Sequence, residues 1–486
     1  MSTIAETTSG PVEGRVKDDA LLFAGIPYAA PPTGEKRFMP AEPHPGWEAV
    51  RGATRFGPAA PQVPSGGMTD NAPVRWDEDC LTLNISTPAL DDRGRPVLVW
   101  IHGGAYRTGQ GAIPWYGGRN FAMNGDIVVV SINYRLGALG FADLSAYGEA
   151  FALSGVNGLL DQVTALEWVR DNIRNFGGDP GKVTIAGESA GGFAVSSLLS
   201  STRAEGLFRR AIPQSGAGHH TLTPEAAARC GAALLAVTGA ASPVELQQLP
   251  AQAILDAQLE IDKQVARGEL DIGFRNTAFY PATGNAFLPV APIDAIRAGQ
   301  GSDVDVLIGS NKDETTLFVT GEVDEAGVAR EADRYGGGEA MVAGYRAKYP
   351  EADPATLFMK MGTDYSFRIP AIRMAEARAA TGGQTWMYRF DWESRAPGLK
   401  ATHALEIPFA FDNLDKAGVD VFIGPGESPQ GVADTMHAAW TRFIRGDDPG
   451  WDTYTPESRV SMRFDTESAQ VTDPDDGLRQ LWQGLR

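Results

Sequence analysis

The segment KVTIAGESAGGFAVSSLLSS, residues 182–201, decides the fold. It begins with the β-branched run Val183–Ala186, turns at Gly187–Gly191, and continues as an apolar stretch to about Leu199. A buried strand that enters a sharp turn and then a helix is typical of a nucleophile elbow, where strained backbone projects a serine hydroxyl above a sheet edge. The segment therefore predicts Ser189 as a nucleophile.

The glycines of this turn have a steric reason, because a Cβ at Gly187 or Gly191 would collide where the strand and the helix pack closely. A G-x-S-x-G pattern alone is weak evidence in a chain with 57 glycines. On the local sequence, the alternative that Ser189 only caps the helix stays open.

Apolar and β-branched patterns on both sides of this segment indicate the fold class. Helical spacing of apolar residues predicts a helix over 160–176, which ends at Gly177 and Gly178, and Asp179–Pro180 is expected to turn the chain into the next strand. Further β-branched runs read as buried parallel strands: Val97–Ile101, Ile127–Ile132 and Val304–Ile308. Strand, helix and strand at this spacing predict an α/β fold with a mostly parallel, twisted sheet covered by helices on both faces.

Composition excludes several classes of protein. The net charge of -19 argues against nucleic-acid binding, since phosphates would be repelled. The chain shows no signal peptide and no apolar run long enough to span a membrane. Its two cysteines, Cys80 and Cys230, are too few for a disulfide framework and fit a reducing compartment. We expect a cytoplasmic protein, monomeric or weakly homo-oligomeric, with no nucleic-acid or membrane partner.

We find no internal repeat and no low-complexity linker, so we expect residues 1–486 to form a single domain. The segment 58–77 is rich in glycine, proline and polar residues, and is the candidate for a mobile lid. An inert surface loop explains the same composition.

A second glycine-rich loop precedes the elbow. The strand-like run 96–101 leads into His102-Gly103-Gly104-Ala105, where small residues let the backbone approach a ligand closely. Backbone N–H groups that point inward stabilise the oxyanion of a tetrahedral intermediate. We predict Gly104, Ala105 and Ala190 as the three donors.

A serine hydroxyl needs a neutral imidazole to take its proton, and a carboxylate to orient that imidazole. In this type of fold the order along the chain is serine, acid, histidine. His403 lies in an irregular stretch after the strand-like run 386–392, whereas His437 lies in an amphipathic helix and reads as structural. For the acid, Asp313 and Glu314 both follow a strand end, and the chemistry does not choose between them.

With these residues identified, the sequence resembles the type-B carboxylesterases, a family that includes bacterial para-nitrobenzyl esterases and animal cholinesterases. The likeness covers nearly the whole chain. It rests on these ordered motifs: FAGIPYAAPPTGEKRF (23–38), EDCLTLNI (78–85), VWIHGGAY (99–106), VSINYRLGALGF (130–141), GLLDQVTALEWVRDNIRNFGGDPGKVTIAGESAGG (158–192), QSG (214–216), NKDET (311–315) and HALEIPFAF (403–411).

The resemblance implies an α/β-hydrolase fold with large insertions and a serine esterase that uses Ser189, Glu314 rather than Asp313, and His403. It implies no cofactor and no metal, and a small-molecule ester as substrate. Supporting roles fall to Gly103, Glu188 and Ser215, and two buried ion pairs are expected: Arg37 with Glu78, and Arg135 with Asp161.

Three departures from the family pattern matter. Ala105 stands where many members have a third glycine, which puts bulky tertiary-alcohol esters in doubt. Ala404 follows the histidine where glycine is usual, and we expect it to be tolerated only with a negative φ. The cysteine that pairs with the position of Cys80 in other members is absent, which supports cytoplasmic residence.

Two other functions compete with an esterase. The first is a non-catalytic binding protein on the same fold, which the presence of all three triad residues disfavours. The second is an amidase or carbamate hydrolase with the same triad. Phe274, Phe279 and Phe318 are candidates for the acyl pocket, with plain core packing as the alternative.

Overall fold

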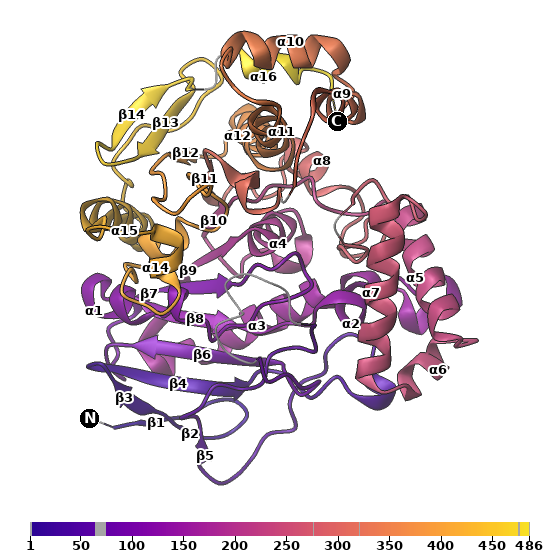
Figure 1. Ribbon diagram of the computed structural model, residues 1–486. Coiled ribbons are helices and arrows are strands. Elements are labelled where there is room, and N and C mark those ends of the chain that lie inside the picture. Colours follow the sequence, from indigo (N-terminus) through magenta and orange to yellow (C-terminus); the bar gives the residue numbers. More distant parts are fainter. Residues whose placement is uncertain (1, 64–73, 276, 320, 475–476, 486) are drawn as a thin grey trace.

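A twisted sheet of eleven strands organises the described part of the computed structural model, which covers residues 2–63, 74–275, 277–319, 321–474 and 477–485 (Figure 1). The strands follow in the order β14-β13-β12-β11-β10-β9-β7-β8-β6-β4-β3. The run from β8 to β13 is parallel, whereas β6, β4, β3 and β14 are antiparallel to their neighbours. Their bounds are β3 Arg15–Lys17, β4 Ala20–Pro27, β6 Thr82–Thr87, β7 Arg95–Ile101, β8 Val128–Ile132, β9 Gly178–Glu188, β10 Arg210–Gln214, β11 Asp305–Asn311, β12 Thr385–Phe390, β13 Val460–Phe464 and β14 Ala469–Thr472.

Strand order reverses between β7 and β9. The chain passes from β7 outward to β8, crosses back over β7 to β9, and then adds β10 to β13 in one direction. The loops at the carboxyl ends of two neighbouring strands diverge at such a point, which opens a crevice for a ligand. A small second sheet, β1 (Ile4–Ala5), β2 (Val12–Glu13) and β5 (Arg51–Gly52), lies beside this framework.

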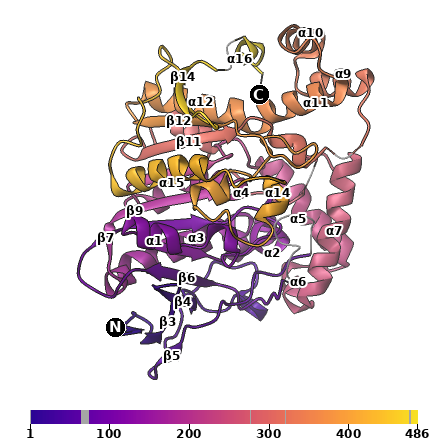
Figure 2. The ribbon, with the colours of Figure 1, turned by 60° about the vertical axis from the view of Figure 1, so that its left-hand side comes forward.

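Helices cover both faces of the sheet because most strands are apolar on both sides. One core contains side chains of α3, α4 and α12, and the other contains side chains of α1, α13 and α15. Figure 2 shows α15 lying across the sheet. The helices are α1 Arg119–Gly125, α2 Gly137–Phe141, α3 Asn157–Asn172, α4 Ala190–Leu199, α5 Pro224–Thr238, α6 Pro243–Gln248, α7 Ala251–Arg267, α8 Pro292–Arg297, α9 Glu325–Arg334, α10 Gly338–Lys348, α11 Pro354–Thr363, α12 Ile369–Ala380, α13 Ile407–Ala410, α14 Val419–Ile423, α15 Gln430–Arg445 and α16 Leu478–Leu481.

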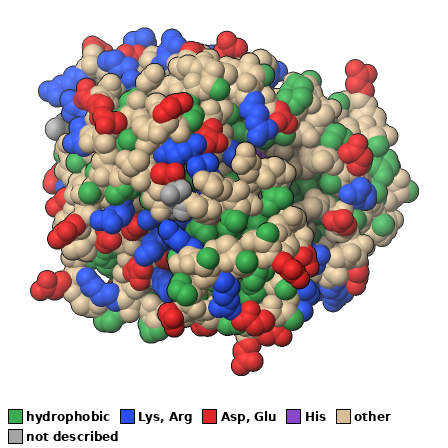
Figure 3. All heavy atoms as spheres, turned by 90° about the horizontal axis from the view of Figure 1, so that it is seen from above, with side chains coloured by type: hydrophobic (Ala, Val, Ile, Leu, Met, Phe, Trp, Pro, Cys, Tyr) green, Lys and Arg blue, Asp and Glu red, His purple; other side chains and the backbone are tan. Residues whose placement is uncertain are grey.

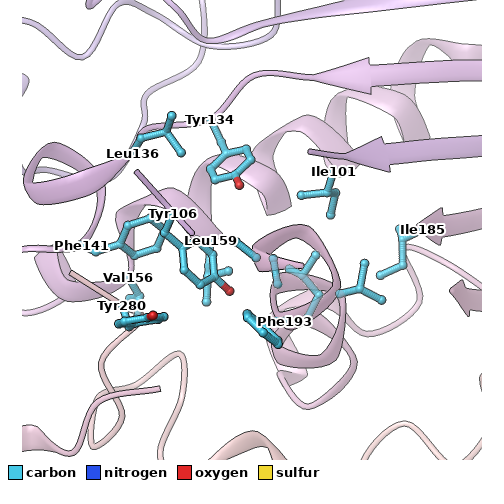
Figure 4. Packing of buried hydrophobic residues seen from close by; sticks show 14 of the residues in the cluster. Ile101, Tyr106, Tyr134, Leu136, Phe141, Val156, Leu159, Ile185, Phe193 and Tyr280 are labelled. Carbon is cyan, nitrogen blue, oxygen red and sulfur yellow. The ribbon is translucent and has the colours of Figure 1, made fainter. Parts of the chain in front are cut away.

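The larger core packs behind the elbow helix. Figure 4 shows Phe193 of α4 and Leu159 of α3 among the buried side chains of this core, together with the rings of Tyr106 and Phe141. The rings of Tyr106 and Phe141 lie 4.9 Å apart between centroids. This packing holds α4, and therefore the turn before it, against the body of the protein.

The α/β class and the parallel central strands are confirmed. The expected turn at Asp179–Pro180 is placed differently: β9 already pairs at Gly178, and residues 179–182 form an irregularity before pairing resumes at Val183. Helix α3 continues as the 3-10 helix η6 (Ile173–Phe176), and Gly177 ends it with a φ of 81°. Of the lid candidate 58–77, residues 64–73 lie outside the described residues.

Further helices lie outside the two layers that cover the sheet. In Figure 1, α5, α6 and α7 stand at the right of the sheet, and α9, α10 and α16 stand at the top. Seen from above, acidic and basic side chains are interspersed and hydrophobic side chains surround a hollow (Figure 3). Within the described residues, no helix is long and apolar enough to cross a membrane.

Candidate active site

The carboxyl ends of four neighbouring strands meet at one edge of the sheet. Ile101 of β7 pairs with Gly187 of β9, Glu188 pairs with Gln214 of β10, and Gln214 pairs with Gly309 of β11. The loops that follow these strands carry the predicted oxyanion residues, Ser189, Ser215 and the Asp313–Glu314 pair. Register in the sheet therefore gathers residues that are far apart in the sequence.

Ser189 lies in the strained turn that the sequence predicts. Its φ of 56° and ψ of -121° are outside the regions that non-glycine residues prefer. A Cβ on Gly191 would lie 2.0 Å from the carbonyl oxygen of Ile101, and one on Gly187 would lie 2.6 Å from the same atom. Strand and helix approach so closely that only glycine fits at either position.

The glycine-rich loop 102–105 packs directly on this turn. A Cβ added to Gly103 would lie 3.2 Å from Cβ of Ser189. Gly104 has a φ of 111°, and a Cβ there would lie 2.2 Å from the Thr108 carbonyl oxygen. The N–H groups of Gly104, Ala105 and Ala190 donate no hydrogen bond to any described residue, so all three are available to an oxyanion beside Ser189.

Glu314, and not Asp313, faces the histidine. Oε2 of Glu314 lies 2.6 Å from Nδ1 of His403, and its Oε1 accepts hydrogen bonds from the Asn311 N–H at 2.7 Å and the Ser215 hydroxyl at 2.6 Å. Asp313 turns the other way, and its Oδ1 accepts from Nζ of Lys360 at 2.6 Å. The choice that the residue chemistry left open follows from these contacts.

The other ring nitrogen of His403 points to the elbow. Nε2 lies 3.1 Å from Oε1 of Glu188, the residue directly before Ser189. Among the described residues, Ser189 Oγ has no hydrogen-bond partner, and the contact of Nε2 with Glu188 Oε1 is within ion-pair distance but is not a hydrogen bond. The imidazole lies between the orienting carboxylate and the elbow.

Three buried carboxylates control the proton on this imidazole. Burial lowers the pKa of His403, but Glu188, Glu314 and Glu406 outweigh it and raise that pKa to about 9. Burial also raises the pKa of Glu188 well above its usual value, against the opposing effect of His403. Each group favours the charged form of the other, because Oε1 of Glu188 lies 3.1 Å from Nε2 of His403.

The sequence and the structure of this chain match known proteins. The pattern of the carboxylesterase family matches residues 1–479. The para-nitrobenzyl esterase of Bacillus subtilis (strain 168) is 38% identical over 487 residues, which is 98% of each chain. The chain belongs to the carboxylesterase family.

Other relatives agree with this assignment. Phenmedipham hydrolase of Pseudarthrobacter oxydans is 36% identical and aligns over 96% of each chain. The solved structure of the Geobacillus stearothermophilus carboxylesterase EST55 has a TM-score of 0.89 and 39% identity, covering 99% of this chain and 100% of its own. The predicted family, the α/β-hydrolase fold and the activity are confirmed: this carboxylesterase hydrolyses carboxylic esters.

One buried carboxylate beside this site was missed from the sequence. Glu406 is fully buried, and its two oxygens accept hydrogen bonds from the side-chain amides of Gln214, at 3.2 Å, and Asn311, at 2.7 Å. Burial and the nearby Glu314 raise its pKa to about 7. Its position three residues after His403, in an otherwise apolar stretch, is the signal that could have identified it.

The expectation for Ala404 is wrong. Its φ is 65°, in the left-handed region, rather than negative. An alanine in that conformation costs about 1 kcal/mol or more, and persists only where the surroundings fix it. Here Ala404 is buried, and its carbonyl oxygen accepts a hydrogen bond from the N–H of Ile407, so the first turn of α13 holds the strained residue.

Aromatic side chains surround the imidazole, but only some are those predicted. Phe318 is 54% exposed and its ring lies 5.1 Å from that of His403, while Phe279 is fully buried core. Phe274 stacks on Tyr280. The sequence reasoning missed Phe367, whose ring lies 4.8 Å from that of His403.

His437 and both expected ion pairs lie where the sequence places them. His437 is buried in α15 and bonds through Nδ1 to the Ala410 carbonyl. Arg37 binds Glu78 through two hydrogen bonds of 2.6 Å. Arg135 binds Asp161 through two side-chain hydrogen bonds of 2.8 and 2.6 Å, with both side chains buried.

Proposed function

We propose that Ser189, His403 and Glu314 form the catalytic triad of this carboxylesterase, with Gly104, Ala105 and Ala190 as the oxyanion hole. The observation that carries the proposal is the position of His403, which is bound to Glu314 at 2.6 Å through Nδ1 and faces the elbow through Nε2. In the reacting state that we propose, Nε2 faces the neighbouring Ser189 hydroxyl in place of the Glu188 carboxylate.

In the first half of the reaction, His403 Nε2 takes the Ser189 proton as Oγ attacks the ester carbonyl carbon. The carbonyl electron pair moves to the oxygen, which accepts hydrogen bonds from the three N–H groups. When the intermediate collapses, the bond to the alcohol oxygen breaks, and that oxygen receives the proton from Nε2. The acyl group stays on Ser189.

Water completes the cycle by the same route. His403 takes a proton from water, the hydroxide oxygen bonds to the acyl carbon, and the bond to Ser189 Oγ breaks as Oγ recovers its proton. Glu314 keeps the imidazole in the tautomer that leaves Nε2 unprotonated and stabilises the imidazolium that forms. Ser215 and the Asn311 N–H hold Glu314 in place through Oε1.

The substrates we propose are small to medium carboxylic esters. A relative that shares 38% identity is named for para-nitrobenzyl esters, and the rings of Phe318 and Phe367 beside His403 offer apolar contact to an aryl or alkyl group. We also propose a single-domain, cytoplasmic enzyme, monomeric or weakly homo-oligomeric, that uses no nucleic acid. One continuous main sheet and two buried free thiols support the first two points.

Steady-state hydrolysis of para-nitrophenyl acetate and butyrate tests the triad. We expect Ser189→Ala, His403→Gln and Glu314→Gln each to lower kcat by about 10³-fold or more, because each removes one part of the proton relay. His437→Gln is the matched control, since that ring lies in α15 and bonds to a backbone carbonyl. If Ser189→Ala kept wild-type turnover, the proposal would be rejected.

A matched ester and anilide separate an esterase from an amidase. Anilides have a poorer leaving group, so we expect the ester to be hydrolysed faster at equal acyl chain. A higher kcat/KM for the anilide would assign the enzyme to the amidase class instead.

A further inference from the structure

Apart from the candidate active site, a cavity lies on the sheet face opposite the larger core, above β4, β6 and β8. Strand pairing sets Leu22, Ser86 and Val129 side by side on this face, with Asn84 beside Ser131 in the adjacent row. The intervening residues of the same strands, such as Ile85 and Val130, point into the larger core. Alternation along the strands therefore gives the cavity a floor that mixes hydroxyl, amide and aliphatic groups.

The cavity has a volume of about 230 Å³, and apolar side chains form most of its walls. Ile113 and Tyr116 come from the loop that follows the oxyanion segment, and Phe56 from the opposite side is 41% exposed. A dry cavity of about 150 Å³ accommodates benzene. This cavity is therefore large enough for one aromatic ring with a substituent.

Cations concentrate at this cavity although the whole chain carries a charge of -19. Lys17, Arg119 and Lys416 line it, with Asp18 as the single lining carboxylate. Lys17 forms no ion pair with a described residue, and Arg119 bonds to the Asp18 carbonyl oxygen and the Asn120 side chain. Lys416 pairs with Asp415, its exposed neighbour.

The cavity is separate from the site already described. None of its lining residues belongs to the proposed triad or oxyanion hole. Gly111, six residues after Ala105 of the glycine-rich loop 102–105, lines the cavity. Its carbonyl oxygen accepts a hydrogen bond from the Ser131 hydroxyl at 2.6 Å. A reagent that seals Ser189 should therefore leave this cavity open.

We propose that this cavity binds a small carboxylate with an apolar body, of the size of benzoate. The ring packs against Leu22, Val129 and Ile113, and the carboxylate faces the three cations. Such acids are the class of product that an ester hydrolase releases, and this one point rests on the proposed function. A neutral ligand of equal shape gains the apolar contacts without the charge attraction.

Binding of benzoate to enzyme with Ser189 sealed by a fluorophosphonate tests the proposal. Mass spectrometry first reports whether Ser189 is modified, which tests the proposed function by itself. Titration calorimetry then measures the affinity for benzoate and for benzamide. We expect benzoate to bind the sealed enzyme at one site, and benzamide to bind it more weakly.

Two lysine double variants test whether benzoate binds in this cavity. Lys17→Gln with Lys416→Gln should weaken benzoate binding about tenfold, because two favourable charge interactions are lost. The matched control, Lys182→Gln with Lys263→Gln, makes the same charge change at exposed lysines outside the cavity and should leave the affinity unchanged. All four lysines are partly or fully exposed, so these variants should fold, and a thermal unfolding curve checks this.

Equal loss of affinity in both double variants, or no benzoate binding to the sealed enzyme, would overturn the proposal. If the probe does not modify Ser189, the lysine variants are compared on unsealed protein. The cavity is then still tested, while the proposed function has failed.

Discussion

At the scale of single residues, Glu188 is the residue of the elbow whose charge acts on the protonation of His403. Its carboxylate lies one residue before Ser189 and 3.1 Å from His403 Nε2. A negative charge at this point favours the imidazolium, whereas catalysis needs a neutral imidazole. We therefore expect Glu188 to influence the pH range in which the enzyme works.

The pH profile of Glu188→Gln tests this role. Burial lowers the pKa of His403 and Glu188 is the first of the carboxylates that raise it, so removing this charge lowers that pKa. The neutral, active form of His403 then persists at lower pH. We expect the acidic limb of log kcat/KM against pH to move to lower pH, while Glu188→Asp keeps it near the wild-type position. An acidic limb that stays in place, or moves to higher pH, would contradict the assignment.

Ala105 has a strained backbone conformation in the glycine-rich loop 102–105. Its φ is 55°, a conformation that costs alanine roughly 1–2 kcal/mol and glycine almost nothing. Glycine also loses more entropy on folding, by roughly 0.4–1 kcal/mol, so we expect Ala105→Gly to raise the free energy of unfolding by about 0.5–1 kcal/mol. Urea denaturation measures it.

The control is Ala253→Gly within helix α7, where alanine has regular helical geometry and we expect a loss of about 1 kcal/mol. Equal losses in the two variants would show that Ala105 is unstrained.

Residue identity alone could not complete the site. Neighbouring Asp313 and Glu314 are chemically equivalent candidates. They differ in partners that are distant in the sequence, which are His403 for Glu314 and Lys360, 47 positions away, for Asp313. Glu406 escaped notice because its partners Gln214 and Asn311 come from other strands. Ala404 was misjudged because helix α13, which holds its positive φ, was not visible as a constraint in the sequence.

At the scale of elements, the elbow depends on a strand and a helix that touch through glycine. A methyl group on Gly191 would lie 2.0 Å from the Ile101 carbonyl oxygen and 3.0 Å from that of His102. Both are backbone atoms of β7 and the loop after it, so neither can rotate away. The close contact holds the oxyanion loop in place relative to Ser189.

Gly191→Ala should therefore force α4 away from β7. We expect the free energy of unfolding to fall by about 3 kcal/mol and esterase activity to be lost with it, because the overpacked atoms are backbone. Gly431→Ala serves as the control, since nothing lies within 4 Å of its added Cβ, and the better helix propensity of alanine in α15 should raise the free energy of unfolding by up to about 1 kcal/mol. A stable, active Gly191→Ala variant would show that the elbow tolerates a larger distance between α4 and β7.

Elements with a strong local pattern could be predicted, and those with a weak one could not. The buried strands β7, β8, β9 and β11 contain short runs of apolar and β-branched residues, and apolar residues recur at helical spacing in α3. The edge strands β3 and β14 carry exposed or half-exposed residues, because little packs over the edges of the sheet. Their pairing partners, rather than their own sequences, define them.

At the scale of the whole molecule, buried ion pairs hold distant segments around the site. Asp161 of α3 binds the guanidinium and the backbone N–H of Arg135, just after β8, and Arg135 also donates to the Met39 carbonyl oxygen. One carboxylate thus connects the N-terminal loops, the sheet and α3. A buried cation without its partner is strongly unfavourable.

Asp161→Asn should lower the free energy of unfolding by about 3–5 kcal/mol, because it leaves the Arg135 charge buried and uncompensated. The matched control is Asp171→Asn, which breaks an exposed pair with Arg170 and should cost below about 1 kcal/mol. Urea midpoints at constant m-value give both numbers. Similar costs for the two variants would refute a structural role for the buried pair.

The most direct test of the whole account is a crystal structure of the enzyme after reaction with a fluorophosphonate. We expect phosphorus bonded to Ser189 Oγ, and the phosphonyl oxygen at about 2.7–3.1 Å from the backbone nitrogens of Gly104, Ala105 and Ala190. His403 should keep its Nδ1 contact with Glu314 and turn Nε2 from Glu188 toward the modified serine. Phosphorus on any other residue, or an imidazole that stays on Glu188 beyond reach of Ser189, would contradict the account.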